Sequence, residues 1–300
     1  MNLTCVKFIS YPVLGKAMML FQNFACMNMQ LQDLHHIASQ FKSRANLSPV
    51  LFIGHGNPMN AVWDNDFTRM LAALGRRIEK PNAVLVISAH WETVGTYVSV
   101  SQNPRTIHDF GGFPDELYEF NYPSAGHPGL ARSLIEMVSL TDVKEDKQMG
   151  LDHGAWTVLK YIWPDGSVPV FEMSMDYTKT PLFHFQLAGQ LKELRKKGVL
   201  ILCSGNIVHN VSMMNFKDID AKPYDWNLEF DANVKKQIDG RDINALINYT
   251  GEGARLAVPT NEHYLPLIYS MGMLYGDEPI SHIYEGYQFA SLSMRSVQIG

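Results

Sequence analysis

The sequence predicts an α/β fold: a single domain in which helices cover a mostly parallel or mixed central sheet. Three observations lead to this prediction. Short apolar runs rich in Val, Ile and Leu alternate with longer stretches of helical periodicity, the pattern of a sheet with helical crossovers. No internal repeat, low-complexity segment or linker rich in Pro, Gly or Ser divides the chain. Several apolar runs end on a histidine, and open α/β sheets bind ligands at the carboxyl ends of their strands.

The strands are expected where short apolar runs are bounded by turn residues. They fall at 49–54, 83–89, 96–101, 168–174 and 199–204. Residues 282–299 read as one or two late strands, which are able to pair antiparallel at an edge of the sheet.

The helices are expected between these strands. Asp64 is a candidate cap for a helix over 65–79, and residues 127–139 repeat apolar positions at helical spacing. A third helix has Thr180 as N-cap, proline at its first position and Gly198 as its stop.

The N-terminal residues differ in composition from the remainder. They contain no acidic residue before Asp33, and lysines and a proline interrupt their apolar stretches. A secretory signal needs an uninterrupted apolar core and a small-residue cleavage site, and neither is clear here. We therefore expect residues 1–48 to be an N-terminal extension, and residues 49–300 to be one catalytic domain.

The bulk composition argues against several classes of partner. The formal net charge is −5 and no basic stripe is visible, so nucleic acid is not expected. The longest apolar runs reach about six to eight residues, well short of the roughly 20 that span a membrane. The three cysteines, Cys5, Cys26 and Cys203, are few, odd in number and far apart, which predicts a reducing, cytoplasmic compartment.

One long segment, residues 103–125, is rich in Gly, Pro and aromatic side chains. A loop of this size in a compact domain is usually functional or disordered, and its aromatic residues argue against disorder. Four of them are candidates to cover a bound ring, with plain packing as the alternative: Phe110, Phe113, Tyr118 and Tyr122.

Five histidines lie just after a predicted strand or at a predicted helix start: His55, His90, His153, His209 and His263. Any one of them, taken singly, reads as a satisfied histidine in a polar loop. All five at such positions suggest a metal site, because imidazole suits iron, zinc and copper. Two histidines plus a carboxylate or a third histidine form non-haem Fe(II) and catalytic zinc sites. An unligated histidine nearby can serve as general acid or base.

Other histidines are assigned to structural positions or to the extension. His35 and His36 lie in residues 1–48, and His184 falls inside the helix that follows Thr180. His282 lies in a late strand, and His127 is expected to help start a helix.

Signatures of other enzyme classes are missing. The chain has no HExxH, no GxxxxGK[ST] and no GxSxG, and GHGNP lacks the third glycine of a dinucleotide fingerprint. Cys203 ends a buried strand and reads as structural, and Ser204 lacks the elbow motif of a serine hydrolase.

Six segments in a fixed order resemble one family. They are GHGNPMNA, SAHW, HDFGGFPDELYEFNYP, GLDHGAW, SGNIVHN and EHYLPL, and they run from about residue 48 to the C-terminus. The chain resembles the extradiol ring-cleavage dioxygenases of the 4,5-DOPA dioxygenase type, which are related to the catalytic chain of protocatechuate 4,5-dioxygenase. The resemblance implies a non-haem Fe(II) enzyme that opens a catechol such as L-DOPA beside its two hydroxyls, using O₂. It also implies that zinc often occupies the site in purified protein.

The resemblance implies metal ligands by position. His55 and His90 match the first two ligands. The third is Glu262 or His263, which are adjacent in the matching segment, and Glu262 is slightly preferred on charge grounds. Two histidines and one carboxylate would leave Fe(II) with one positive charge, which a catechol monoanion balances.

The resemblance also implies catalytic roles for two further histidines. His209 matches the acid/base histidine of the family, and in a zinc-filled resting form it is able to reach the metal itself. His153 matches a histidine thought to contact the substrate and dioxygen. A substrate carboxylate would need a cation, for which Arg105, Lys160 and Arg255 are candidates.

Two alternatives remain open at the level of sequence. A zinc-dependent hydrolase can use the same ligand types, with a bound water as nucleophile. A non-catalytic binding protein can keep the fold and its pocket, although such relatives have usually altered the ligand set.

Overall fold

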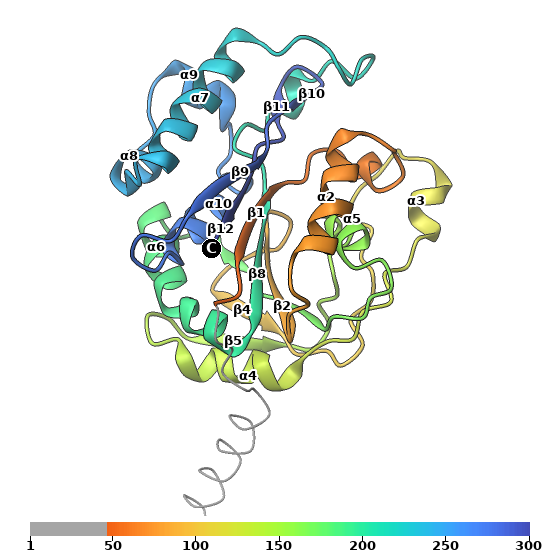
Figure 1. The fold of residues 1–300 in the computed structure, drawn as a ribbon, viewed down its shortest axis with the longest axis vertical. Coiled ribbons are helices and arrows are strands. Elements are labelled where there is room, and N and C mark those ends of the chain that lie inside the picture. The colour runs from red at the N-terminus through yellow and green to blue at the C-terminus, as the bar shows by residue number, and fades with distance from the viewer. Residues whose placement is uncertain (1–46) are drawn as a thin grey trace, which may run out of the picture. The chain divides into compact units, whose positions relative to one another are not determined.

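A six-stranded mixed sheet lies at the centre of the computed structural model, which describes residues 47–300 (Figure 1). Its strand order is β6-β2-β8-β1-β12-β9. The bounds are Val50–Gly54 for β1, Ala83–Ser88 for β2, Val170–Glu172 for β6, Val199–Gly205 for β8, Ile280–Tyr284 for β9 and Ser296–Ile299 for β12. Strands β6, β2, β8 and β1 run parallel, whereas β12 pairs antiparallel with both β1 and β9. The predicted α/β class and the antiparallel late strands are confirmed.

Three short strand pairs lie outside this sheet. They are β3 (Glu92–Thr93) with β7 (Met175–Asp176), β4 (Thr96–Ser99) with β5 (Val143–Asp146), and β10 (Tyr287–Gln288) with β11 (Leu292–Ser293). The strand predicted at 96–101 is therefore present as β4, but its partner is β5 rather than a strand of the central sheet.

Helices cover both faces of the sheet, with α2 and α5 on one side and α6 and α10 on the other (Figure 1). The α-helices are α2 (Asp66–Arg77), α3 (Asp115–Glu119), α4 (Pro128–Met137), α5 (His153–Ile162), α6 (Pro181–Leu191), α7 (Asp225–Asp239), α8 (Ile243–Ile247), α9 (Glu252–Ala257) and α10 (Leu265–Gly272). Short 3₁₀ turns span Pro58–Ala61, Lys192–Lys197 and Val211–Met213. Among the described residues, no helix is both long enough and apolar enough to cross a membrane.

The predicted cap of α6 is observed, whereas that of α2 is not. Thr180 caps α6 as predicted, and Gly198 ends the following 3₁₀ turn at φ 77°, a left-handed conformation that suits glycine. The cap of α2 is Asn65 rather than Asp64, because Asn65 and Thr68 form a reciprocal capping box. Asp64 instead forms an ion pair with Arg69, with Oδ1 2.9 Å from Nε.

The predicted domain boundary falls close to the first described residues. The expected extension, residues 1–48, lies outside the described residues except for Leu47 and Ser48. Ser48 is buried, and its backbone N–H and C=O are both hydrogen-bonded to Arg195. His35 and His36 also lie outside the described residues.

The inner strands bring three chain segments to one edge of the sheet. Every residue of β1, β2 and β8 is buried, as expected for parallel strands covered on both faces. The residues that directly follow these strands continue the backbone pairing. His55 N–H donates to Gly205 C=O at 3.0 Å, and Ala89 N–H donates to Ser204 C=O at 2.9 Å. Side chains that follow β1, β2 and β8 therefore meet at the same edge.

Candidate metal centre

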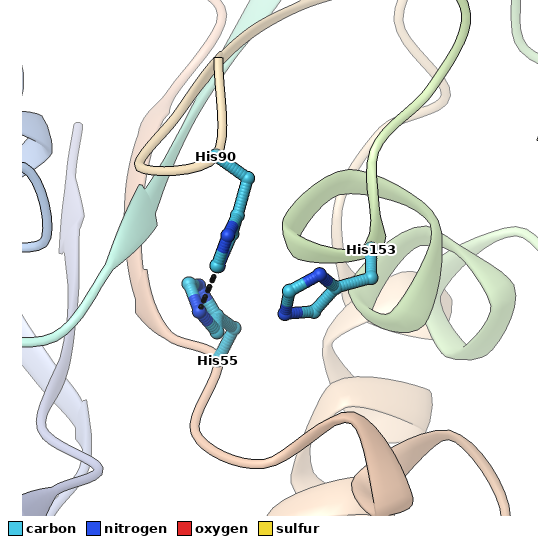
Figure 2. A group of neighbouring side chains, drawn as sticks. All are labelled: His55, His90 and His153. Atoms are coloured by element: carbon cyan, nitrogen blue, oxygen red, sulfur yellow. Dashed lines mark hydrogen bonds between the residues drawn. The ribbon is translucent and has the colours of Figure 1, made fainter. Parts of the chain in front are cut away.

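Five histidines from five parts of the fold lie around this edge. His55, His90 and His209 follow the carboxyl ends of β1, β2 and β8. His153 is the first residue of α5, and His263 lies in the turn that precedes α10. Figure 2 shows the rings of His55, His90 and His153 pointing toward one another. The sequence prediction named these five residues, and the fold brings them together.

The ring-to-ring distances show how tight the cluster is. The centroid of His90 lies 3.8 Å from that of His153 and 5.0 Å from those of His55 and His263. His55 lies 5.4 Å from His263 and 5.7 Å from His153. His55 Nε2 and His90 Nε2 lie 3.1 Å apart (Figure 2).

The tautomer of His55 follows from its hydrogen bonds. Ser204 has one hydroxyl proton, which it donates to the Gly154 C=O at 2.6 Å, since a carbonyl only accepts. Ser204 Oγ must therefore accept from His55 Nδ1, 2.9 Å away. The proton of His55 is on Nδ1, and Nε2 presents a lone pair to the cluster.

Carboxylates lie behind Nδ1 of two further rings. His263 Nδ1 donates to Glu262 Oε1 at 2.9 Å, and His90 Nδ1 lies 3.4 Å from Asp109 Oδ2. A carboxylate favours a proton on the nitrogen that faces it, which leaves Nε2 as a free acceptor. His263 Nε2 is buried and has no hydrogen-bond partner, as expected of a metal ligand.

This donor set fits a bound cation. The lone pairs of His55 Nε2 and His90 Nε2 face each other at 3.1 Å, which is repulsive unless a cation lies between them. Metal–nitrogen bonds of about 2.0–2.1 Å place neighbouring imidazole nitrogens about 2.9–3.4 Å apart for right-angle to tetrahedral geometry. The observed separation lies within that interval. His55 and His90 therefore suit one divalent metal. The ligand atoms of His55, His90 and His153 lie within 4.8 Å of one another, and the ring centroid of His263 lies 5.0 Å from that of His90 and 5.4 Å from that of His55.

Burial keeps these imidazoles neutral. The pKa of His55 and of His263 is lowered well below the ordinary value, first by burial and then by the neighbouring histidines. The pKa of His90 is lowered by burial and by His153, against an opposing effect of Asp109. Neutral imidazoles are the form that binds metal, so these three residues are ready to ligate at neutral pH.

Glu262 lies behind His263 in the described conformation. Its Oε1 accepts from His263 Nδ1 and from Thr260 Oγ1, each at 2.9 Å. Thr260 does not cap α10, although its position before the helix suggests it: α10 begins only at Leu265, and the Thr260 hydroxyl binds a side chain instead of a backbone N–H. Glu262 thus orients the His263 ring.

His209 stacks on His263. The two ring centroids are 3.5 Å apart and the planes are tilted by 5°. The backbone N–H of His209 donates to the Ala257 C=O at 2.9 Å, which fixes the chain here. Burial, followed by the charge of His153, lowers the pKa of His209 to about 4. Ligand atoms of His209, Glu262 and His263 lie within 4.8 Å of one another.

The sequence reasoning did not single out Asp109. Its Oδ1 accepts from the backbone N–H of His153, and its Oδ2 accepts from His153 Nδ1, both at 2.9 Å. Burial by itself raises the pKa of Asp109, but hydrogen bonds and charge from His153 and His90 outweigh it and lower that pKa to about 2. Only the unusual length of its loop hinted at a role.

The aromatic residues of the long loop divide into two groups. Phe110 lies beside the cluster, 5.6 Å from His153, and packs against Phe113 at 5.3 Å and Tyr118 at 5.2 Å. Tyr122 belongs to the core and donates its hydroxyl to the Trp163 C=O at 2.9 Å, so it does not cover the site.

Two glycines permit close approaches at the site. A Cβ on Gly205 would lie 2.2 Å from the His263 carbonyl oxygen, and one on Gly154 would lie 2.5 Å from Ser88 Oγ. Backbone contacts at both positions hold the histidine-bearing segments: Asn206 N–H donates to His263 C=O at 2.8 Å, and Gly154 C=O accepts from Ser204.

Two buried carboxyl groups lie behind the site. Asp152 caps α5 and accepts from Ser88 Oγ at 2.8 Å, and its own backbone N–H donates to Glu172 Oε1 at 3.1 Å. Within residues 47–300, neither Asp152 Oδ2 nor Glu172 Oε2 has a hydrogen-bond partner. Burial, followed by the charge of nearby carboxylates, raises the pKa of Asp152 to about 6 and that of Glu172 well above its ordinary value.

Lys160, Arg105 and Arg255 are the cations proposed for a substrate carboxylate. Lys160 Nζ donates to the Ala61 C=O and lies 4.4 Å from the ring of Phe120, so it is engaged elsewhere. Arg105 and Arg255 are exposed.

The histidines assigned to structural positions agree with the fold: His184 is fully buried, His127 caps α4 and His282 lies in β9.

Comparisons with known proteins agree with this chemistry. The family described as the catalytic LigB subunit of aromatic ring-opening dioxygenase matches residues 47–296. The 4,5-DOPA dioxygenase extradiol of Escherichia coli K12 is 44% identical over 257 residues, which cover 84% of this chain and 94% of that protein. The protein of the same name from Beta vulgaris is 34% identical over 238 residues, 77% of this chain and 88% of that protein.

A solved structure extends the similarity to the fold. The crystal structure of uncharacterized protein JW3007 from Escherichia coli K12 matches with a TM-score of 0.75 and 40% identity, covering 84% of this chain and 100% of that chain. The family suggested by the sequence motifs is confirmed, and the hydrolase and non-catalytic alternatives are not favoured. The chain therefore belongs to the family of the catalytic LigB subunit of aromatic ring-opening dioxygenases, and it is a metal-dependent dioxygenase of that family.

Proposed function

We propose that this protein opens the ring of a catechol beside its two hydroxyl groups, with L-DOPA as a substrate cleaved in the 4,5-extradiol mode. The observation that carries the proposal is the pair of Nε2 atoms of His55 and His90, 3.1 Å apart, beside the buried and unpartnered Nε2 of His263, in a member of a ring-opening family. The choice of substrate rests on the names of the Escherichia coli and Beta vulgaris relatives.

Fe(II) is the proposed catalytic metal, held by His55, His90 and His263. When bound, it would supply the redox chemistry that joins catechol and O₂. Zinc accepts the same ligands, so zinc is expected in purified protein without supporting ring cleavage. In such a zinc-filled form we also assign His209 to the ion, since its ligand atom lies within 4.8 Å of those of Glu262 and His263.

His209 is the proposed acid/base residue. Its pKa, lowered to about 4, keeps the ring neutral at neutral pH, so one ring nitrogen has a lone pair with which to accept a proton. The parallel stack on His263 fixes the plane of the ring. We assign it the removal of a proton from a catechol hydroxyl and the later return of a proton to the opened product.

His153 and the long loop complete the substrate side. Asp109 holds His153 Nδ1, so the opposite nitrogen, Nε2, is free to contact the substrate and dioxygen. Phe110, at 5.6 Å from His153, offers an apolar face for an aromatic ring and excludes water from it.

Anaerobic reconstitution tests the function. Protein loaded with Fe(II) and L-DOPA is mixed with O₂, while oxygen uptake and the visible spectrum are followed together. We expect one O₂ consumed per L-DOPA and a new yellow absorbance. Zinc-loaded protein should give neither signal.

Two matched histidine variants sharpen this experiment. His55→Asn removes a proposed ligand, whereas His127→Asn lies outside the site and keeps a side chain that can cap α4. Loss of uptake only in His55→Asn is expected. Iron-loaded wild-type protein that consumes no O₂ with L-DOPA or simpler catechols would refute the proposed function.

A further inference from the structure

One carboxylate serves two histidines that have different proposed tasks. Asp109 Oδ2 lies 2.9 Å from Nδ1 of His153 and 3.4 Å from Nδ1 of His90. Its other oxygen, Oδ1, accepts from the backbone N–H of His153 at 2.9 Å. The side chain is 24% exposed, and its segment precedes α3 instead of following a strand of the central sheet. Asp109 therefore reaches the cluster from the covering loop.

The carboxylate decides which nitrogen of each neutral ring carries the proton. An ionised Asp only accepts hydrogen bonds, so the Nδ1 atoms that face it hold protons. For His90 this choice matters because its Nε2 lies 3.1 Å from His55 Nε2. In the opposite tautomer, His90 Nε2–H would donate to His55 Nε2, and both nitrogens would be lost as metal ligands.

The Asp109 carboxylate is the side chain that distinguishes the two nitrogens of the His90 ring. His90 Nε2 lies 3.1 Å from His55 Nε2, a contact that by itself is compatible with a proton on His90 Nε2, whereas Asp109 Oδ2 lies 3.4 Å from His90 Nδ1, within ion-pair distance. His55 Nδ1 is already held by Ser204. The backbone N–H of His90 donates to Ser88 Oγ, which positions the main chain but not the ring tautomer. For His153, the two hydrogen bonds that it donates to Asp109 set both the tautomer and the ring orientation.

We propose that Asp109 is a positioning residue that keeps His90 and His153 in the Nδ1–H tautomer, and so holds Nε2 of one open for metal and Nε2 of the other open for substrate. The inference rests on the proposed function, in which His90 is a ligand and His153 faces the substrate. It adds that the covering loop, through Asp109, sets the ligand geometry beneath it.

Asp109→Asn is the decisive variant because it keeps the shape of the side chain. Asparagine has one acceptor oxygen and an NH₂ group that only donates, so it cannot accept from the His153 backbone and from His153 Nδ1 with separate oxygens. An NH₂ group facing Nδ1 favours the Nε2–H tautomer. Asp115→Asn, an exposed aspartate in α3 of the same segment, is the matched control.

The first measurement is the imidazole tautomer, read from long-range ¹⁵N–¹H NMR of the full Zn²⁺-loaded chain, because the facing Nε2 lone pairs of His55 and His90 repel without a cation. His153 and His90 signals are assigned by their loss in His153→Gln and His90→Gln. We expect Nδ1–H in wild type and in Asp115→Asn, and a shift to Nε2–H in Asp109→Asn. Wild-type rings found mainly as Nε2–H would overturn the proposal, even if Asp109→Asn failed to fold.

The second measurement is Zn²⁺ affinity by competition with a chelator, which needs no turnover. Loss of an outer partner of a ligating histidine typically weakens metal binding about 10- to 100-fold, and we expect that loss in Asp109→Asn. Unchanged tautomers together with Zn²⁺ affinity within twofold of wild type would overturn the proposal. Because neither readout involves a catechol, failure of the dioxygenase activity alone leaves this test intact.

Discussion

The rings of His209 and His263 lie face to face, with centroids 3.5 Å apart and planes tilted by only 5°. Two charged imidazoles at this distance would repel, and burial lowers the pKa of both rings. The stack therefore joins two neutral rings, one proposed to bind metal and the other to move a proton. Substitutions that keep or remove the stack can separate these two roles.

His209→Ala is expected to retain metal and lose turnover. The ligands His55, His90 and His263 stay in place, whereas loss of the proton acceptor should lower kcat about 10²- to 10⁴-fold. The measurement is iron content together with oxygen uptake under saturating L-DOPA. His209→Phe is the companion variant, since it preserves an aromatic face against His263 but cannot take a proton. Near-normal turnover in His209→Phe would contradict the acid/base assignment.

Glu262→Gln and His263→Ala separate the two candidates for the third ligand. If His263 binds the metal and Glu262 holds its Nδ1, Glu262→Gln should weaken Zn²⁺ binding about 10- to 100-fold. His263→Ala removes a ligand and should weaken binding more. Equilibrium competition with a chelator measures both. The reverse order of effects would make Glu262 the ligand, as the charge argument from the sequence preferred.

Ser204→Ala tests the tautomer of His55. The substitution removes the acceptor of the buried His55 Nδ1–H, which costs about 1–3 kcal/mol of stability, and removes the Ser204 hydroxyl that donates to the Gly154 C=O. Zn²⁺ affinity should fall about 10- to 100-fold as the ring loses its fixed orientation. Ser133→Ala, whose hydroxyl bonds only within α4, is the control for calorimetry and metal binding. Zinc affinity that survives in Ser204→Ala would show that packing alone holds His55.

Glu172→Gln tests the buried carboxyl groups behind the site. The pKa of Glu172 is raised well above 4.5, chiefly by burial and then by Asp152. Above pH 4.5 the folded chain binds more protons at this group than the unfolded chain, so the free energy of unfolding falls as pH rises toward the raised pKa. Glutamine does not titrate, so the stability of the variant relative to wild type should increase from pH 5 to pH 8.

Thermal unfolding at a series of pH values measures this difference. Glu136→Gln, on the exposed side of α4, is the control and should shift stability equally at every pH. A stability difference between Glu172→Gln and wild type that stays constant across the series would mean that Glu172 does not hold its proton in the folded chain.

The features of the site that could be predicted are those that depend on local sequence pattern. Apolar runs such as those before His55, His90 and His209 predict both a strand and the residue at which it ends. Parallel strands bring such ends to one edge of the sheet. The fold class and the cluster of histidines follow from that rule. The capping residue of α2 did not, because Asp64 and Asn65 are both good caps and only the reciprocal bond with Thr68 selects one.

The sequence did not predict which way individual side chains point or which distant residues contact one another. Glu262 and His263 are neighbours in the chain, and the conformation of the turn before α10 decides which side chain points toward the cluster. In the structure Glu262 accepts from His263 Nδ1, whereas the charge argument from the sequence favoured Glu262 as the ligand. Asp109 lies 44 residues from His153, in a segment without periodicity. Ser204 was weighed only as a nucleophile, since a hydroxyl that accepts from a histidine and donates to a carbonyl leaves no motif.

The late strand β12 also sets when the site can form during synthesis. It pairs with β1, the strand that delivers His55, and Ser296 Oγ accepts from the backbone N–H of Gly54 at 3.2 Å. A partner so distant in sequence becomes available only after residue 296 has left the ribosome, and such contacts slow folding. The nascent chain therefore exposes one edge of β1 while its histidines are already present. The sheet edge that carries His55 is therefore complete only when the last strand of the chain has paired with β1.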